Sequence, residues 1–246
     1  MTVYIFEYTI KNRPEYNSEI TERMERMGSL VDSFSLREIN FAKTRLNILK
    51  VVKDRITQKD FDDITVDEIC KYAEISRGTF FNYFPSKNHI FNYYIRVWMI
   101  QLGLEMEKQK FKSSQEKIKK IYDKVIEEDT NYPGFIENYL KYLLESKEIN
   151  NEIKLTQAEL AYKFSLENIK KENMEMFNSL SMEKIFENFI NEGVSNGEFK
   201  KDINKENTLL LLLSLFFSPA VMKFINKSFD LKRYYEEALD NIFHNV

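Results

Sequence analysis

The sequence contains few of the residues that turns and covalent cross-links require. Its 246 residues include 6 glycines, 4 prolines and 1 cysteine. So few turn residues exclude a sandwich or barrel built from many short hairpins. The single cysteine, Cys70, cannot form an internal disulfide, which indicates an intracellular protein.

The sequence also lacks the residue sets of common catalytic and metal sites. Its two histidines, His89 and His244, fit none of the spacings of zinc peptidases or of Ser/His and Cys/His nucleophiles. Carboxylates at the spacing of a paired acid and base are also missing. We therefore expect a protein that is not an enzyme and that uses neither a metal nor a cofactor.

Excess positive charge and long hydrophobic runs are absent as well. A net charge of −3 and an isoelectric point near 5.7 give no overall attraction to nucleic acid or anionic membrane. The longest apolar run, Leu209 to Met222, has 14 residues, fewer than the roughly 18 that a membrane-spanning helix needs. Glu7 interrupts the stretch from Val3 to Ile10, which therefore does not read as a signal peptide. We expect a cytoplasmic protein without membrane contact.

Residues 1–35 are predicted to form an N-terminal extension. Val3 to Ile10 is β-branched and aromatic, as a short strand would be, whereas Ile20, Met24, Met27 and Val31 follow helical spacing. Four basic and six acidic residues in this segment argue against an arm that grasps DNA. We expect it to pack loosely on the rest of the chain.

The next segment predicts a compact group of helices. Apolar residues recur at steps of three and four from about Arg37 to Lys59, which is typical of an amphipathic helix. Thr65 and Glu68 form a capping box, so a second helix should begin at Val66. Cys70 falls on the apolar stripe of that helix and is predicted to be a core residue.

A short third helix follows after a very tight connection. Ser76 is a good N-cap for a helix over Arg77 to Phe84, and Phe80 and Phe84, four residues apart, can both point inward. Pro85 should end this helix, with Ser86 capping the next one and Lys87 in its first turn. The side chains left outside or on the flanks are Arg77, Thr79, Phe81, Asn82 and Tyr83.

The remainder of the chain is predicted to be helical, with no internal repeat. Capping residues, a loop from Asn131 to Gly134, the stop signal Asn196-Gly197 and apolar spacing mark the boundaries of these helices. The expected ranges are about 87–107, a helix opening at Ser113, 135–147, 151–178, a helix opening at Ser181, an apolar helix that starts at Asn204 or Asn207 and includes Leu209 to Met222, and 231–244.

The order helix, capped helix, tight turn, short helix with exposed polar and aromatic residues is that of a helix-turn-helix, whose last helix lies in the DNA major groove. Residues 37–87 hold ten basic and eight acidic residues, whereas residues 88–246 hold 22 and 25. Arg77 can bond a guanine, Thr79 a phosphate or a thymine methyl, and Asn82 a base edge or a phosphate. Lys87 and the amides behind Thr65 are predicted anion sites for the DNA backbone.

The run from Ile64 to Lys87 resembles the helix-turn-helix of the TetR family of bacterial transcriptional regulators almost position by position. Cys70 stands where that family usually has alanine, Glu74-Ile75 replaces a commoner Ala-Gly-Val turn, and Phe81 stands where tyrosine is typical. Because Phe81 has no hydroxyl to bond a phosphate, Tyr83 should carry more of that contact. The residues assigned to DNA binding are Thr65, Arg77, Gly78, Thr79, Phe81, Asn82, Tyr83 and Lys87.

The resemblance implies an all-α protein with an extension over residues 1–35, a helix-turn-helix domain over 36–90 and a regulatory and dimerisation domain over 91–246. In such regulators the last two long helices of each subunit pair in a homodimer. Residues of this seam, or of a monomer core, would be Leu210, Leu213, Phe217, Leu239 and Ile242. Residues that line an effector pocket, or that only pack, would be Trp98, Tyr122, Tyr139, Tyr142 and Phe164.

The leading hypothesis is a repressor that a small apolar or aromatic effector releases from double-stranded operator DNA. One alternative is a regulator that answers to a protein partner or has no effector. Another is a helical carrier or enzyme that uses the central region and keeps the helix-turn-helix as scaffold.

Overall fold

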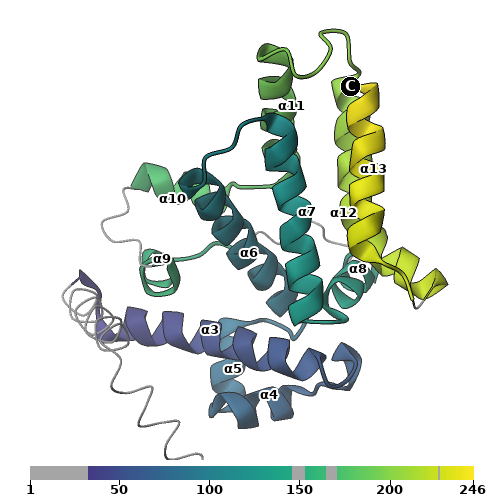
Figure 1. Ribbon diagram of the computed structural model, residues 1–246. Coiled ribbons are helices and arrows are strands. Elements are labelled where there is room, and N and C mark those ends of the chain that lie inside the picture. The colour runs from purple at the N-terminus through teal and green to yellow at the C-terminus, as the bar shows by residue number, and fades with distance from the viewer. Residues whose placement is uncertain (1–32, 146–152, 165–170, 227) are drawn as a thin grey trace, which may run out of the picture. The chain divides into compact units, whose positions relative to one another are not determined.

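The computed structural model describes residues 33–145, 153–164, 171–226 and 228–246 (Figure 1). Every regular element in these ranges is a helix, which confirms the all-α prediction. The strand and helix predicted before residue 33 lie outside the described residues. The elements are α3 (Leu36–Ile56), η1 (Phe61–Asp63), α4 (Val66–Ala73), α5 (Arg77–Tyr83), α6 (His89–Lys108), α7 (Ser114–Asn131), α8 (Phe135–Glu145), α9 (Gln157–Phe164), α10 (Lys171–Asn178), α11 (Met182–Ser195), α12 (Lys205–Ile225) and α13 (Leu231–Asn245).

The chain divides into two compact units. The smaller one contains the first part of α3, up to Leu46, together with α9. Within it, Arg45 Nη1 lies 3.1 Å from Glu159 Oε1, and both side chains are buried. A buried charge is tolerated only when it is paired, so this contact fixes how the start of α3 packs on α9. The larger unit contains residues 47–155 and 171–246.

Helix α9 begins later than the sequence analysis predicted. The expected helix over 151–178 is wrong at its start, because residues 153–156 are not helical. Thr156 and Glu159 cap the helix: Thr156 Oγ1 accepts from the Glu159 amide at 3.2 Å, and Glu159 Oε2 accepts from the Thr156 amide at 2.8 Å. This capping box makes Gln157 the first helical residue.

Helix α6 also begins later than predicted. Ser86 was expected to cap it, but the Ser86 hydroxyl lies 2.7 Å from His89 Nδ1, and the helix starts at His89. Residues 86–88 form a turn instead. Lys87 therefore precedes the helix rather than standing in its first turn.

In the larger unit, aromatic rings connect η1 to α6 and α8. The rings of Phe61 and Phe91 are 4.3 Å apart, and Phe91 packs edge-on against Phe135 at 5.3 Å. At the rim of this cluster, Lys141 of α8 pairs with Asp62 of η1. Tilted and edge-on rings at these separations add to the energy of burial, so η1 is firmly attached to both helices.

Helices α7, α11, α12 and α13 lie side by side and enclose a hydrophobic core (Figure 1). Leu212 of α12 and Phe186 of α11 are fully buried there. Gly193 of α11 is required because a Cβ at this position would lie 2.3 Å from the Phe199 ring. Helix α12 is long and apolar enough to cross a membrane by length and composition alone, a test that core helices of soluble proteins also pass.

Candidate nucleic-acid interface

The segment from Thr65 to Tyr83 forms two short helices joined by a tight turn. Thr65 caps α4 by accepting from the Glu68 amide at 3.1 Å, as the sequence predicted. The turn is made by Glu74, which adopts the left-handed conformation with φ 56° and ψ 43°. Ser76 then caps α5 by accepting from the Thr79 amide at 3.0 Å. Local hydrogen bonds therefore set both helix starts, and a strained residue sets the angle between them.

Helix α5 has a buried aromatic side and an exposed side. Phe80 and Phe84, the residue that follows the helix, are both 0% exposed, which confirms that they point inward. Phe84 packs edge-on against Tyr93 of α6 at 5.5 Å. These buried rings hold α5 against the rest of the domain.

The outer side of α5 carries the residues assigned to DNA. Arg77, Phe81 and Asn82 are exposed, whereas Thr79 and Tyr83 are half-buried on the flanks. Gly78 is also exposed, and a Cβ there would meet only Ser76 Oγ, at 3.7 Å. The local packing therefore does not require a glycine at this position.

The polar groups at the start of α5 are already paired with one another. Arg77 Nη1 donates to Asp67 Oδ1 at 2.6 Å, and the guanidinium lies 5.8 Å from the centre of the Phe81 ring. The hydroxyls of Ser76 and Thr79 are 2.9 Å apart. The sequence analysis missed Asp67, because its spacing of ten residues from Arg77 predicts contact only once the turn angle is known.

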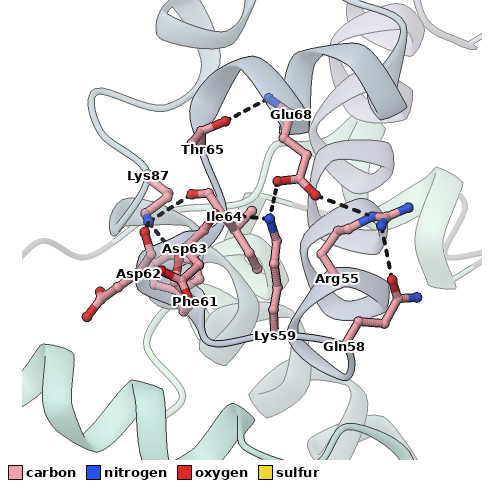
Figure 2. Close-up of polar contacts among 10 residues, drawn as sticks. All are labelled: Arg55, Gln58, Lys59, Phe61, Asp62, Asp63, Ile64, Thr65, Glu68 and Lys87. Atoms are coloured by element: carbon pink, nitrogen blue, oxygen red, sulfur yellow. Dashed lines mark hydrogen bonds and ion pairs between the residues drawn. The ribbon is translucent and has the colours of Figure 1, made fainter.

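Two lysines hold the loop that precedes α4 (Figure 2). Lys87 Nζ donates to the carbonyl oxygens of Phe61, Asp62 and Ile64 at 2.7, 3.3 and 2.9 Å. Lys59 Nζ donates to the carbonyl of Asp63 at 3.0 Å. The four consecutive carbonyls of residues 61–64 are therefore all bound by two ammonium groups.

The electrostatics of this loop follow from the same contacts. Burial lowers the pKa of the Lys87 ammonium, which also lies 4.3 Å from the centre of the Phe61 ring. The hydrogen bond from Lys59 lowers the pKa of the Glu68 carboxyl. Arg55 approaches the other oxygen of Glu68 at 3.9 Å. Glu68 in the first turn of α4 thus binds Lys59 through a charge-assisted hydrogen bond and pairs with Arg55 in the last turn of α3.

The predicted phosphate contact of Lys87 stays a prediction. In the structure, the lysine reaches back across 23 to 26 residues to the loop carbonyls. Its ammonium can hold the loop as described or release it to bind a phosphate.

Helix α4 also carries an exposed aromatic residue. Tyr72 is 46% exposed, and the Arg55 guanidinium lies 3.7 Å from its ring centre. The sequence analysis did not single out this pair. Tyr72 falls off the apolar stripe of α4, and this position could have marked it as a surface ring.

Two of the five residues predicted for an effector pocket, Tyr122 and Trp98, pack in the core of the larger unit. Tyr122 is fully buried, stacks on Phe186 and donates its hydroxyl to the Leu212 carbonyl at 2.6 Å. Trp98 is half-buried and packs on Phe216. Their placement agrees with packing, one of the two roles considered for them.

The other three candidates belong to α8 and α9. Tyr139 and Tyr142 of α8 adjoin the Phe91 ring, and burial raises the pKa of Tyr139 to about 12. Asn92 donates to the Tyr142 hydroxyl at 2.8 Å. Phe164 belongs to α9, in the smaller compact unit.

The residues predicted for a dimer seam also differ in exposure. Leu210 of α12 is exposed, and Leu213 and Phe217 are half-buried. On α13, Leu239 is 2% exposed and part of the chain's own core, and Ile242 packs against that core. The outward positions of α12 include further large apolar side chains, namely Leu211, Val221, Phe224 and Ile225.

Comparisons with known proteins agree with this geometry. Residues 48–94 match the family model described as bacterial regulatory proteins, tetR family. No curated protein matches the chain.

Solved structures share the fold over most of the chain. The transcriptional regulator FadR from Bacillus subtilis in complex with stearoyl-CoA has a TM-score of 0.57 at 17% identity, covering 82% of this chain and 98% of its own. The fatty acid degradation regulator FadR from Bacillus halodurans has a TM-score of 0.57 at 13% identity, covering 81% and 98%. Reduced NemR from E. coli has a TM-score of 0.52 at 15% identity, covering 82% and 96%.

The family match lies on the segment from the second part of α3 to the start of α6, which carries the capped α4, the tight turn and the exposed side of α5. The structural likeness extends well beyond that segment. Residues 48–94 thus match the model of the bacterial regulatory proteins, tetR family, and the chain shares its fold with these solved structures over most of its length.

Proposed function

We propose that the protein is a homodimeric cytoplasmic repressor that binds a specific operator and leaves it when a small apolar effector binds among its C-terminal helices. The observation that carries this proposal is the composition of α5. Its buried side is aromatic, and its exposed side presents a guanidinium, an amide and a ring. Such groups suit the edges of base pairs in a major groove.

Each exposed residue has a role that its chemistry supports. Arg77 reads a guanine, and Asn82 contacts a base edge or a phosphate. Phe81 covers an apolar edge such as a thymine methyl. Gly78 allows the helix backbone to approach the groove closely, because it adds no side chain on the exposed side.

The remaining interface residues hold the DNA backbone. Thr65 presents the amino-terminal end of α4 to a phosphate. Tyr83 and Thr79, on the flanks of α5, bond further phosphates. Lys87 contributes by fixing the loop that carries Thr65, since its ammonium binds the carbonyls of that loop.

A second copy of the chain is proposed to cover the exposed apolar side of α12. Leu210, Leu211 and Val221 are each about half exposed, and Phe224 is 90% exposed. Large apolar side chains gathered on one helix are typical of a protein interface. Pairing through α12 would give the dimer two α5 helices for half-sites roughly 34 Å apart.

The effector class is proposed from the chemistry of the C-terminal region. Its helices enclose a core rich in leucine, isoleucine and aromatic rings, which suits an apolar ligand. A structural neighbour was solved with stearoyl-CoA, so acyl compounds are the first probes to use. The effector can shift the protein toward the DNA-free conformation only by the difference between its affinities for the DNA-free and DNA-bound conformations.

The proposal is tested first on Arg77. Fluorescence anisotropy would compare the full chain with Arg77→Ala on labelled duplexes that tile the DNA upstream of its gene. We expect the substitution to weaken operator binding by about tenfold or more and to relax the preference at one base pair in each half-site. Arg233→Ala is a matched control, because Arg233 is exposed on α13 and pairs with Glu237. An equal loss on every sequence would overturn the reading role of Arg77.

The effector is tested through Trp98, the single tryptophan of the chain. Stearoyl-CoA or oleate, added to the complex of protein and operator, should change Trp98 fluorescence over the same concentrations at which it releases DNA. A change in fluorescence without release would contradict regulation by that ligand. If no apolar compound shifts the melting temperature, the regulator answers to a protein partner or to no effector.

A further inference from the structure

The ion pair between α4 and α5 joins two exposed residues at the centre of the proposed interface. Arg77 is the first residue of α5, and Asp67 lies in the first turn of α4. Their side chains are 59% and 68% exposed, and Nη1 lies 2.6 Å from Oδ1. An exposed pair of this kind adds little to stability. The ion pair instead fixes the position of the Arg77 guanidinium.

The bond to Asp67 leaves other donors of the Arg77 guanidinium available to read a base. Because Asp67 engages Nη1, the opposite edge of the planar group still offers Nε and Nη2. Two adjacent donors on one edge match the two acceptors of guanine. The Phe81 ring, 5.8 Å from the guanidinium carbon and one turn along α5, limits its movement on a second side. The side chain is thus oriented before DNA arrives.

We propose that Asp67 is a specificity-determining residue that acts through Arg77, and this rests on the proposed function. It orients the guanidinium toward a base and competes with phosphates for it. Orientation before binding reduces the side-chain entropy lost on reading the correct base. Competition weakens binding to sequences that offer Arg77 only phosphates. Asp67 therefore raises the ratio of specific to non-specific affinity, although its negative charge opposes binding to any DNA.

The test uses Asp67→Asn with a matched control that removes the same charge. Asp63→Asn is that control. It removes one exposed carboxylate in η1 and leaves the bond between Arg77 and Asp67 in place. Anisotropy titrations would use the operator and a set of duplexes that each carry one base-pair change in both half-sites. Both variants should bind unrelated DNA more tightly than the wild type, since each removes one negative charge. Thermal melting would confirm that both variants fold.

Only Asp67→Asn should change base reading. We expect discrimination to fall about threefold, the scale of an exposed ion pair, at the one base pair whose preference Arg77→Ala relaxes. Discrimination at other positions should stay as in the wild type. In the Arg77→Ala background, Asp67→Asn should have no further effect on discrimination. Asp67→Glu keeps the charge but moves the carboxylate, so it should lower discrimination without tighter binding to unrelated DNA.

Three results would overturn the proposal. Discrimination could stay unchanged in Asp67→Asn, could fall equally at every position, or could fall to the same extent in Asp63→Asn. If Arg77→Ala itself leaves every base preference intact, the proposed reading role of Arg77 fails instead. If the full chain shows no preference among duplexes, both proposals fail.

Discussion

Helices α5 and α12 both present large side chains to solvent, but the two exposed faces differ in chemistry. On α5 they are Arg77, Phe81 and Asn82, which combine charge, amide and ring. On α12 they are aliphatic residues together with Phe224. The first face suits the polar and varied surface of a DNA groove, and the second suits another apolar protein surface.

The two helices also differ in how they are held. Seven-residue α5 depends on its cap, on the turn at Glu74 and on two buried rings. The 21 residues of α12 are held by a buried side that includes Leu209, Leu212 and Leu215, followed by Pro219 and Ala220. A short helix fixed at both ends can be placed accurately in a groove, whereas a long one can supply the area that a stable dimer needs. Four predictions test this comparison.

The largest effect is expected from a charge on the α12 face. Leu210→Glu should weaken self-association by about 30-fold or more, because a buried anchor would become a desolvated charge. Sedimentation velocity over a concentration series measures this. Leu210 is 55% exposed in one chain, so the circular dichroism spectrum should not change. Unchanged self-association would show that the dimer interface does not involve α12.

The next effect separates stability from binding on α5. Gly78→Ala should keep or raise the melting temperature, because alanine favours a helix and its Cβ meets only Ser76 Oγ at 3.7 Å. Its affinity for the operator should nevertheless fall about tenfold, the size of one lost base contact. Calorimetry and anisotropy measure the two quantities on the same sample. Unchanged affinity would show that this side of α5 stays clear of DNA.

A smaller effect is expected at the loop before α4. Lys87→Met removes the donor to three carbonyls and should weaken binding to every sequence by about fivefold, or about 1 kcal/mol, near the net energy of one typical hydrogen bond. The slope of log affinity against log salt should not change. Lys59→Met, which frees the Asp63 carbonyl, should behave in the same way. A slope reduced by about 0.9 in Lys87→Met would instead place its ammonium on a phosphate.

The smallest effect is expected at the turn. Glu74→Gly relieves the strain of a left-handed backbone at this residue. Because glycine also gains entropy in the unfolded chain, which offsets part of this relief, the free energy of unfolding should rise by only about 0.5 kcal/mol. Urea denaturation at several protein concentrations measures it. A lower free energy of unfolding would mean that the Glu74 side chain contributes more than its backbone strain costs.

The sequence predicted the parts of this architecture that depend on local signals. The caps at Thr65 and Ser76 and the inward aromatic residues of α5 depend on neighbours within four positions, and the structure has them as expected. The capping box at Thr156 was equally local, but it was hidden inside a long helical pattern. The spacing of Thr156 and Glu159 is the sequence signal for the start of α9.

The parts that could not be predicted depend on contacts between distant residues. Lys87 meets carbonyls more than twenty residues earlier, and Asp67 meets Arg77 only across the turn. Leu239 follows the same helical spacing as a seam residue but is buried in the chain's own core. Helical periodicity identifies an apolar face without showing whether the same chain or a second one covers it.

The most direct measurement is an anisotropy titration of the full chain against duplexes that tile the DNA upstream of its gene, at several salt concentrations. The account predicts tight binding to one near-palindromic tile, saturation at two chains per pair of half-sites and a steep loss of affinity with salt. Weak and equal binding to every tile at every salt concentration would contradict it.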